Sequence, residues 1–433
     1  MGGTRPLDPA WPASDPKEGA TASAPARRHT RYRRRASHPV RSALVLVVII
    51  GTVCAGAYVA SAKFGLFPLP FVTRAAQPTA TPTAATATAV PSSTPTPTPS
   101  ATQSPALQAT ATPAAPPTIT VDAVGDMEFD RGVASLIARD GGAAPLSKVA
   151  RLLSAAAVTV GNLESCLSDK GGRVVKDVTF RGDPRAIAGL TAAGFDLVSL
   201  ANNHVLDLGP VALADEIARL DRAHIAHAGA GRSSAAAWSP AVVGRHGAKV
   251  ALLSFSWVVP PGFLAGAHKS GFASGRYDSA AVRRAIRAAK AKSDYVLVSF
   301  HWGKEYSDQA SSEQIAAAHS AIDAGANMVV SEHPHVIQAV ERYRKGIIAY
   351  SLGDFVFDHY SRVTGESFIL KAELGASGVG VARILPVYLA GSGRPSVVTG
   401  SEASSILARL RSISAERGTR IDVKGSEATV SFK

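Results

Sequence analysis

Residues 76–117 constrain the fold of this chain more than any other segment, because they cannot join a packed core. These 42 residues consist almost entirely of Ala, Thr, Pro and Ser, and none is charged. They offer few large apolar side chains to bury, so disorder is expected. Proline-rich extended chain rises ~3.1 Å per residue, which gives a reach of about 130 Å. We therefore predict a disordered Thr/Pro/Ala-rich stalk over residues 63–117 and a folded domain from residue 118.

An uncharged run before the stalk has the length of a membrane-spanning helix. Residues 42–62 read SALVLVVIIGTVCAGAYVASA, and one helical crossing of a bilayer needs ~20 apolar residues. Arginines cluster directly before this run, so the positive-inside rule makes residues 1–41 a basic cytoplasmic tail. The competing interpretation is a cleaved signal peptide, because Ala60-Ser61-Ala62 has the form of a cleavage site. Both interpretations export the rest of the chain. The membrane-span interpretation makes the protein a single-pass cell-membrane protein with an extracytoplasmic C-terminal domain.

The distribution of charge argues against a nucleic-acid partner. The formal net charge is +13, but residues 1–41 hold nine Lys/Arg against three Asp/Glu and so carry +6 of it. Residues 118–433 carry only +5, a mild excess for a domain of that size. The two cysteines, Cys54 in the apolar run and Cys166 after the stalk, exclude a disulfide framework.

After residue 118 short apolar runs alternate with alanine-rich helical patterns, which is typical of a layered α/β domain. Strands are expected at 118–124, 158–160, 195–200, 249–255, 295–300, 327–330 and 347–350. Helices are expected at 211–223, 280–292 and 311–324. Beyond residue 358 the pattern predicts a closing antiparallel sheet with one helix near 403–417.

Five polar clusters each stand just past the end of an expected strand. They are GDME at 125–128, GNLE at 161–164, ANNHVLD at 201–207, HWGKEY at 301–306 and SEHPHV at 331–336. Ligands bind α/β sheets at the carboxyl ends of the strands, so the five clusters are expected to converge on one crevice. Taken singly, each cluster also fits an ordinary turn, a helix cap or a core histidine.

The residue types in these clusters point to a metal centre. Asp, Glu, Asn and His side chains without a thiolate form a mixed oxygen and nitrogen set that suits Mn, Fe or Zn. In extended chain, alternation would place His333 and His335 on one side, with Pro334 stiffening the backbone between them. Two divalent ions ~3.5–4 Å apart need about this many ligands and one bridging carboxylate.

In order and spacing the motifs resemble the capsule-biosynthesis CapA family, accessory proteins of poly-γ-glutamate synthesis. The resemblance rests on GDMEFDR, GNLES, SLANNHVLDLG, HAGAG, SFHWGKEY and EHPHVIQAVERYRKGIIAYSLGDFVFD, and it covers residues 118–358. It implies a calcineurin-like metallophosphoesterase fold, which is a four-layer α/β/β/α sandwich with a dinuclear metal site between two sheets. That domain is expected over residues 118–400, with a C-terminal helix and strand at 401–433 packed on it.

The resemblance also implies roles for single residues. It makes His204 the acid–base catalyst and Glu164 the carboxylate that bridges two ions. It implies metal ligands at Asp126, Glu164, Asn203, His301, His333 and His335. The sequence departs from the phosphoesterase pattern at Glu128, where a histidine ligand is usual, and at Glu332, where a glycine is usual. The common Gly-Asn-Phe is replaced by Gly353-Asp354-Phe355.

Three functional hypotheses follow. The first is a membrane-anchored, extracytoplasmic protein that supports capsule or poly-γ-glutamate synthesis or export through a metal centre. In a hydrolytic mechanism Arg131 or Lys304 would hold an anionic substrate. The second is a metal-dependent envelope phosphoesterase unrelated to capsule. The third is a non-catalytic surface accessory that binds a polyglutamate synthase complex and its anionic polymer.

Overall fold

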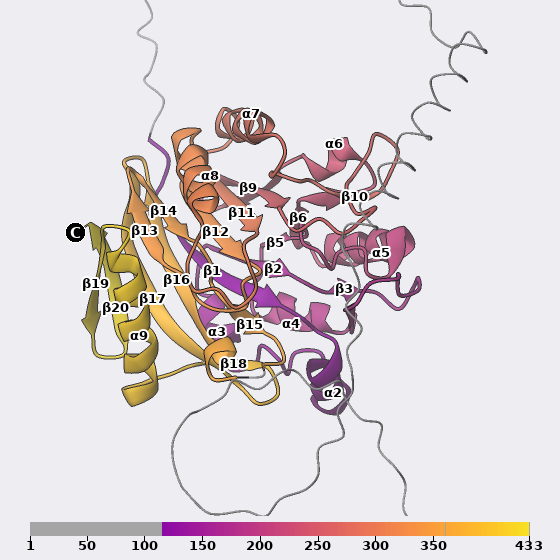
Figure 1. Ribbon diagram of the computed structural model, residues 1–433, viewed down its shortest axis with the longest axis horizontal. Coiled ribbons are helices and arrows are strands. Elements are labelled where there is room, and N and C mark those ends of the chain that lie inside the picture. Colours follow the sequence, from indigo (N-terminus) through magenta and orange to yellow (C-terminus); the bar gives the residue numbers. More distant parts are fainter. Residues whose placement is uncertain (1–114, 360, 433) are drawn as a thin grey trace, which may run out of the picture. The chain divides into compact units, whose positions relative to one another are not determined.

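The computed structural model describes residues 115–359 and 361–432 (Figure 1). The predicted cytoplasmic tail at 1–41, the predicted membrane span at 42–62 and nearly all of the predicted stalk lie outside these residues. Within the described residues, no helix combines the length and the apolar character needed to cross a bilayer.

The larger of two main sheets contains ten strands, four of which run parallel at one side. These four are β1 (Ile119–Met127), β2 (Val158–Leu163), β5 (Leu197–Ser199) and β6 (Ala226–Ala228). On the other side of β1 the sheet continues in antiparallel order through β16 (Glu366–Gly375), β17 (Gly378–Ala390), β20 (Glu427–Phe432) and β19 (Thr419–Lys424). Two short strands pair with interior strands outside this order, β15 (Asp354–Val356) with the end of β1 and β18 (Arg394–Val397) with β17.

The smaller main sheet contains six strands in the order β13-β14-β12-β11-β9-β8. Their bounds are β8 (Ala241–Arg245), β9 (Ala248–Ser256), β11 (Tyr295–His301), β12 (Met328–Glu332), β13 (Val340–Tyr343) and β14 (Gly346–Ala349). Strands β9, β11, β12 and β14 are parallel to one another, so their carboxyl ends share one edge. Two further pairs are small, namely β3 (Cys166–Leu167) with β4 (Arg181–Gly182) and β7 (Ala230–Gly231) with β10 (Gly271–Phe272).

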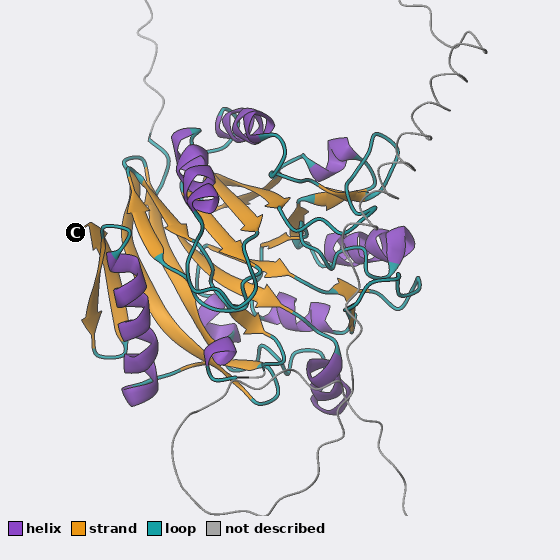
Figure 2. Ribbon diagram, viewed as in Figure 1, coloured by secondary structure: helices purple, strands orange, loops and turns teal. Residues whose placement is uncertain are grey.

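The two main sheets pack face to face, and helices cover their outer faces (Figure 2). Along β1, Val121 and Ala123 face the smaller sheet and Val124 faces the outer helices, and an irregularity of register after Ala123 puts Met127 on the same side as Val124. The helices over the larger sheet are α2 (Arg131–Asp140), α3 (Ala150–Leu153), α4 (Ala186–Ala192) and α5 (Gly209–Arg222). Those over the smaller sheet are α7 (Ser279–Lys290) and α8 (Ser312–Asp323). The short α6 (Ser234–Ala237) and the 3₁₀ turn η1 (Val363–Gly365) lie in connections.

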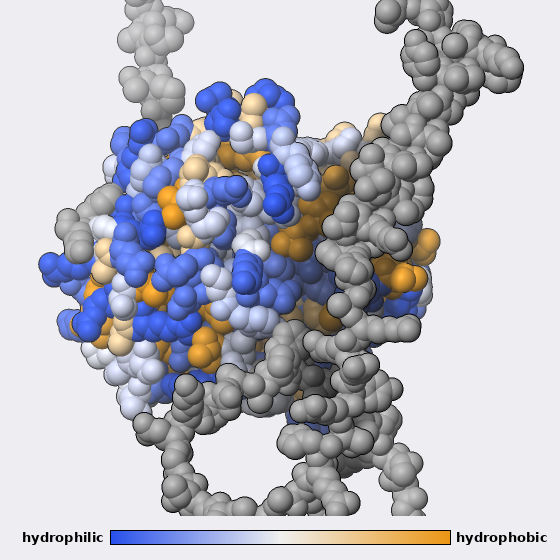
Figure 3. Space-filling view, in the orientation of Figure 1, coloured by the Kyte–Doolittle hydropathy of each residue, from blue (hydrophilic) through white to orange (hydrophobic). Residues whose placement is uncertain are grey.

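Local sequence explains where α7 and α8 begin and which face they bury. At α8 a capping box forms, because Ser311 Oγ accepts from Gln314 N and Gln314 Oε1 accepts from Ser311 N. Helix α7 buries Val282, Ile286 and Ala289, which lie on one helical face. Its outer surface is hydrophilic (Figure 3).

The C-terminal elements link the two sheets. Helix α9 (Gly400–Ala415) packs on β19, β17 and β13, and Ser414 Oγ accepts from Val340 N of the smaller sheet at 2.9 Å. At the other end of the described chain, Tyr295 Oη donates to Pro117 O at 2.8 Å, where β11 begins. The α/β class predicted from the sequence is confirmed.

Candidate metal centre

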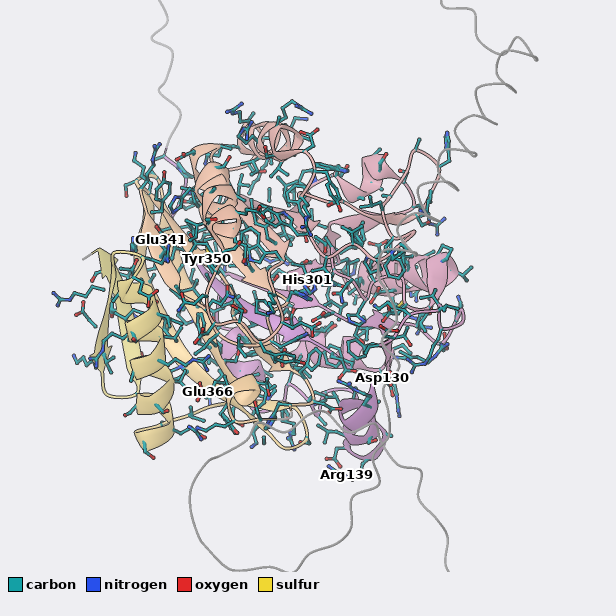
Figure 4. The ribbon with its side chains drawn as sticks, in the orientation of Figure 1. Asp130, Arg139, His301, Glu341, Tyr350 and Glu366 are labelled. Carbon is teal, nitrogen blue, oxygen red and sulfur yellow. The ribbon has the colours of Figure 1, made fainter. Side chains whose placement is uncertain are left out.

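The polar clusters meet because the parallel strands that precede them end at facing edges of the two sheets. Asp126 lies opposite both Asn162 on β2 and Asp354 on β15, and His301 ends β11 next to Glu332 on β12. Figure 4 shows His301 near the middle of the molecule, at the end of its strand. The polar clusters therefore meet at the carboxyl ends of the parallel strands of both sheets, as the sequence predicts.

Two glycines let β1 and β15 approach closely enough to bring their carboxylates together. Asp126 N donates to Gly353 O at 3.1 Å. A Cβ atom at Gly125 would lie 1.8 Å from that same oxygen, so no side chain fits there. Gly353 has φ +71°, in the left-handed region that favours glycine. The Gly-Asp dipeptides at 125–126 and 353–354 thus place two acidic residues side by side.

The first group of metal-ligating atoms comes from Asp126, His335 and Asp354, whose ligand atoms lie within 4.8 Å of one another. His335 Nδ1 donates to Asp354 Oδ1 at 2.8 Å and lies 3.8 Å from Asp126 Oδ2. Asp126 Oδ1 also accepts from Asn162 Nδ2 at 2.7 Å, and its Oδ2 accepts from His333 N at 3.0 Å. These contacts fix the orientation of the Asp126 carboxylate.

The second group comes from Glu164, His301 and His333, whose ligand atoms also lie within 4.8 Å of one another. His301 Nε2 lies 3.3 Å from Glu164 Oε1 and donates to Asn203 Oδ1 at 2.6 Å. Asn162 Nδ2 approaches His301 Nδ1 at 3.2 Å. Both Glu164 oxygens and His333 Nδ1 are buried without a hydrogen-bond partner. Unpartnered buried donors and acceptors of this kind are costly unless a ligand satisfies them.

The buried ionisable groups of the centre include more carboxylates than cations. Burial raises the pKa of Asp126 and of Glu164 to about 7, and that of Asp354 to about 6. Burial lowers the pKa of His301 to about 4. At His335 burial also acts to lower the pKa, but the Asp354 carboxylate outweighs it and raises the pKa to about 10. Three buried carboxylates thus face one charged imidazole, and divalent cations fit this donor set.

Beside the second group, His204 is held in a hydrogen-bonded chain. His204 Nδ1 donates to Asp207 Oδ2 at 2.5 Å, and its Nε2 lies 3.9 Å from Glu164 Oε1. Lys176 Nζ donates to Asp207 Oδ1 at 2.6 Å and to Asn203 O at 2.5 Å. The Phe180 ring stacks on the imidazole with centroids 4.1 Å apart. Asp207 and Phe180 therefore fix the ring, and Nε2 points to the ligand groups.

The backbone of the His-Pro-His segment differs from the extended chain that the sequence suggested. His333 has φ +98° and His335 has φ +58°, so neither residue is extended and strand alternation is the wrong reason for their proximity. Instead, a turn between Glu332 and Val336 brings the two ring centroids to 5.9 Å. Left-handed φ at a residue with a bulky side chain is uncommon and occurs where surrounding contacts impose it.

The two residues expected to hold an anionic substrate are both exposed. Arg131 Nε lies 3.2 Å from Asp358 Oδ2, and its guanidinium covers the Phe180 ring at 4.9 Å. Lys304 is exposed. Glu128, which stands where a histidine ligand is usual, belongs to neither ligand group, and one of its oxygens accepts from Asp130 N.

Sequence reasoning gave no separate role to four residues that shape the centre: Asn162 and Asp207, which lie in two of the five clusters, and Lys176 and Asp354, which lie in none. In the sequence Asp354 stands out only as a departure from Gly-Asn-Phe. Its position directly after a glycine, as at Gly125-Asp126, was the available signal. Lys176 lies in an irregular loop, and no sequence pattern indicates that its ammonium group reaches Asp207.

Comparison with known proteins places these observations in context. Residues 120–359 match the family described as "Bacterial capsule synthesis protein PGA_cap". The capsule biosynthesis protein CapA of Bacillus anthracis is 30% identical over 289 residues, which cover 65% of this chain and 70% of that protein. The PGA biosynthesis protein CapA of Bacillus subtilis (strain 168) is 28% identical, covering 62% of this chain and 71% of that one.

A solved structure was also matched. The 5'-nucleotidase precursor from Thermus thermophilus aligns with a TM-score of 0.38 and 13% identity, over 68% of this chain and 59% of that chain. The resemblance to CapA proteins drawn from the motifs is confirmed by the family match and by the Bacillus relatives. This chain belongs to the bacterial capsule synthesis protein family PGA_cap.

Proposed function

We propose that the protein supports capsule or poly-γ-glutamate synthesis or export from outside the cell membrane, through a two-metal hydrolytic centre of the metallophosphoesterase type. Family membership supports the biosynthetic role. A relative in Mycobacterium tuberculosis (strain CDC 1551 / Oshkosh) that is 34% identical over 218 residues is called a probable polyglutamine synthesis accessory protein. The uncharged run at 42–62 supports the single membrane anchor. The synthase complex and its anionic polymer are the partners we propose.

The observation that carries the hydrolytic proposal is the position of His204 beside two buried ligand groups. Asp126, His335 and Asp354 would hold one divalent ion, and Glu164, His301 and His333 the other, with Asn203 next to the second group. We propose Glu164 as the residue shared between the ions, because both its oxygens are buried without a hydrogen-bond partner. When bound, two such ions would supply Lewis acidity and lower the pKa of a nucleophilic water.

The protein's own side chains would then move the proton and orient the substrate. Asp207 accepts from His204 Nδ1, and burial lowers the pKa of His204 to about 4, so Nε2 carries a lone pair that would take a proton from the nucleophilic water and pass it to the leaving group. Lys176 keeps Asp207 in place on its other side. Arg131, whose guanidinium lies over the Phe180 ring, would meet an anionic group at the rim.

The test is hydrolysis by the purified full chain. Metal-free protein is supplied with Mn²⁺, Zn²⁺ or Fe²⁺ and assayed against chromogenic phosphomonoesters and phosphodiesters. We expect turnover that requires metal and disappears with chelator. Absence of turnover with every metal and substrate class would contradict the hydrolytic part of the proposal.

A second candidate function is binding of the polymer and the synthase without catalysis, and the exposed face of α7 favours it. Arg284, Arg287, Lys290 and Lys292 are exposed at this helix or just after it, which suits an anionic polymer. Polymer production in cells separates the two candidates. If a Glu164→Gln chain supports normal production, the binding role stands and the catalytic role fails.

A further inference from the structure

Glu305 offers a carboxylate to the metal centre from the solvent side. It is exposed, yet its carboxylate and one nitrogen each of His333 and His335 lie within 4.8 Å of one another. The sequence motifs assign it no role. It differs in accessibility from the other acidic ligands, because Asp126, Glu164 and Asp354 are buried.

Hydrogen bonds on both sides of Glu305 fix its turn onto the His-Pro-His segment. Before it, Trp302 N donates to Glu332 O at 3.0 Å. After it, Tyr306 N donates to Pro334 O at 2.8 Å, and Gln338 Nε2 donates to Ser307 O at 2.8 Å. These contacts fix the backbone of the turn, and the fixed backbone positions the Glu305 carboxylate beside the imidazoles of His333 and His335.

The backbone of this turn is also costly, which indicates that the contacts impose it. Gly303 has φ +93°, and Tyr306 has φ +62° although it is not glycine. A left-handed backbone is unfavourable for tyrosine and persists only where its surroundings determine it. The turn therefore has a defined shape with Glu305 near its middle.

Two independent features point to a cation between Glu305 and the imidazoles. His333 is 5% exposed, and its Nδ1 has no hydrogen-bond partner. The three buried carboxylates carry three negative charges when ionised, whereas two divalent ions carry four positive charges. Glu305 is the fourth carboxylate of the ligand groups and makes the two totals equal.

We propose that Glu305 is an exchangeable metal ligand that occupies, from the solvent side, the position that an anionic substrate takes. This inference rests on the metal centre of the proposed function. Buried ligands keep their ion throughout, but an exposed carboxylate can leave because water solvates it at once. Glu305 thus stabilises the metal-bound centre before substrate binds, and it competes with phosphate-like anions for the same ion.

The test uses the metal-free full chain titrated with Mn²⁺, with free Mn²⁺ measured by electron paramagnetic resonance. We compare wild type, Glu305→Gln and a control, Glu313→Gln, whose residue is exposed in the first turn of α8. We expect two ions in wild type and control. In Glu305→Gln one of them should bind about tenfold more weakly. Inorganic phosphate should bind the Mn²⁺-saturated Glu305→Gln chain about tenfold more tightly than wild type, because its competitor is gone.

The outcomes separate this inference from the function on which it rests. If wild type binds two ions and Glu305→Gln matches it for both Mn²⁺ and phosphate, the role of Glu305 is overturned and the metal centre stands. If Glu305→Gln binds Mn²⁺ more weakly but its phosphate affinity falls or is unchanged, Glu305 is a fixed ligand, and its exchange with an anionic substrate is overturned. If wild type binds no Mn²⁺, both the inference and the proposed centre fail.

Discussion

At the scale of single residues, Glu164 is the side chain that we propose to be shared between two ions. It is fully buried, and neither of its oxygens accepts a hydrogen bond. Glu164→Gln keeps the shape but removes the charge that offsets repulsion between two cations. We expect metal content to fall from about two ions to about one or fewer by elemental analysis. Glu216→Gln is the matched control, because Glu216 is equally buried but accepts from Leu167 N away from the crevice. Equal metal loss in both variants would point to general destabilisation.

Glu164 also sets a pH dependence of stability in the metal-free protein. Its pKa is raised by burial from 4.5 to about 7, so the folded chain holds this proton more tightly than the unfolded chain. The resulting stabilisation is present below about pH 4.5 and is lost as the pH rises through 7. Glutamine has no such proton. Between about pH 5 and pH 8 the free energy of unfolding of Glu164→Gln should therefore rise relative to wild type, by of the order of 3 kcal/mol.

Urea unfolding in chelator at the two pH values measures this difference. At the higher pH, saturating Mn²⁺ should make wild type more stable than Glu164→Gln, because ions bind the ionised carboxylate of wild type. If Mn²⁺ leaves the difference in unfolding free energy between wild type and Glu164→Gln unchanged, a role for Glu164 in holding metal is contradicted.

His204 is expected to affect rate without affecting metal content. Its Nε2 faces Glu164, but His204 belongs to neither ligand group. His204→Ala should lose ~10²–10⁴-fold in kcat, the range for a missing general acid or base. Asp207→Asn should lose activity in the same direction, since the imidazole loses its orienting acceptor. His268→Ala, at an exposed histidine outside the ligand groups, should leave kcat unchanged. Metal loss in His204→Ala would make it a ligand instead.

At the scale of elements, the close approach of β1 and β15 positions two carboxylates. Gly125→Ala would push a methyl group against Gly353 O, so the strands must separate. We expect a loss of about 1–3 kcal/mol in unfolding free energy and weaker Mn²⁺ binding. Gly244→Ala on β8 is the control, because a Cβ there has no neighbour within 4 Å. Chemical denaturation of both metal-free variants measures the difference, and equal stability would show that the strands adapt without cost.

The strands around the centre show which elements hydrophobic patterns in the sequence can predict. Hydrophobic runs indicate β1, β2, β9, β11 and β12 to within a few residues, because buried parallel strands are continuous apolar segments. The three-residue β15 could not be found in this way. It is too short to show a period, and its place beside β1 depends on chain far away in sequence. The role of Asp354 therefore became visible only in three dimensions.

Residues near the crevice were harder to interpret than strands for a related reason. Strand alternation predicts His333 and His335 on one side, yet a left-handed turn brings them together. The contacts that impose this turn come from β11 and its following loop, through Pro334 O and Glu332 O. The local sequence shows that His333 and His335 are present, whereas backbone contacts from residues distant in sequence determine the orientation of their side chains.

At the scale of the whole molecule, we expect the domain to be exposed at the cell surface and tethered through its N-terminal segment. Protease added to intact cells should release a soluble domain by cutting between residues 76 and 117, where the composition predicts accessible chain. Immunoblotting of supernatant against cell pellet measures the release. Protection until the membrane is lysed would contradict the orientation predicted from the basic cluster at 27–41.

The contact between Tyr295 and Pro117 has a practical consequence for anyone who handles this domain. Tyr295 begins β11 and His301 ends it, so the chain enters the domain about 20 Å from the metal centre, measured along the strand. A bead, a sensor chip or a fused reporter attached directly at Ala115 would therefore lie at the end of β11 that is away from the metal centre. Immobilised in this way, the protein presents its crevice to the flowing solution, and soluble anions or polymers can be captured and washed off without the support blocking their path.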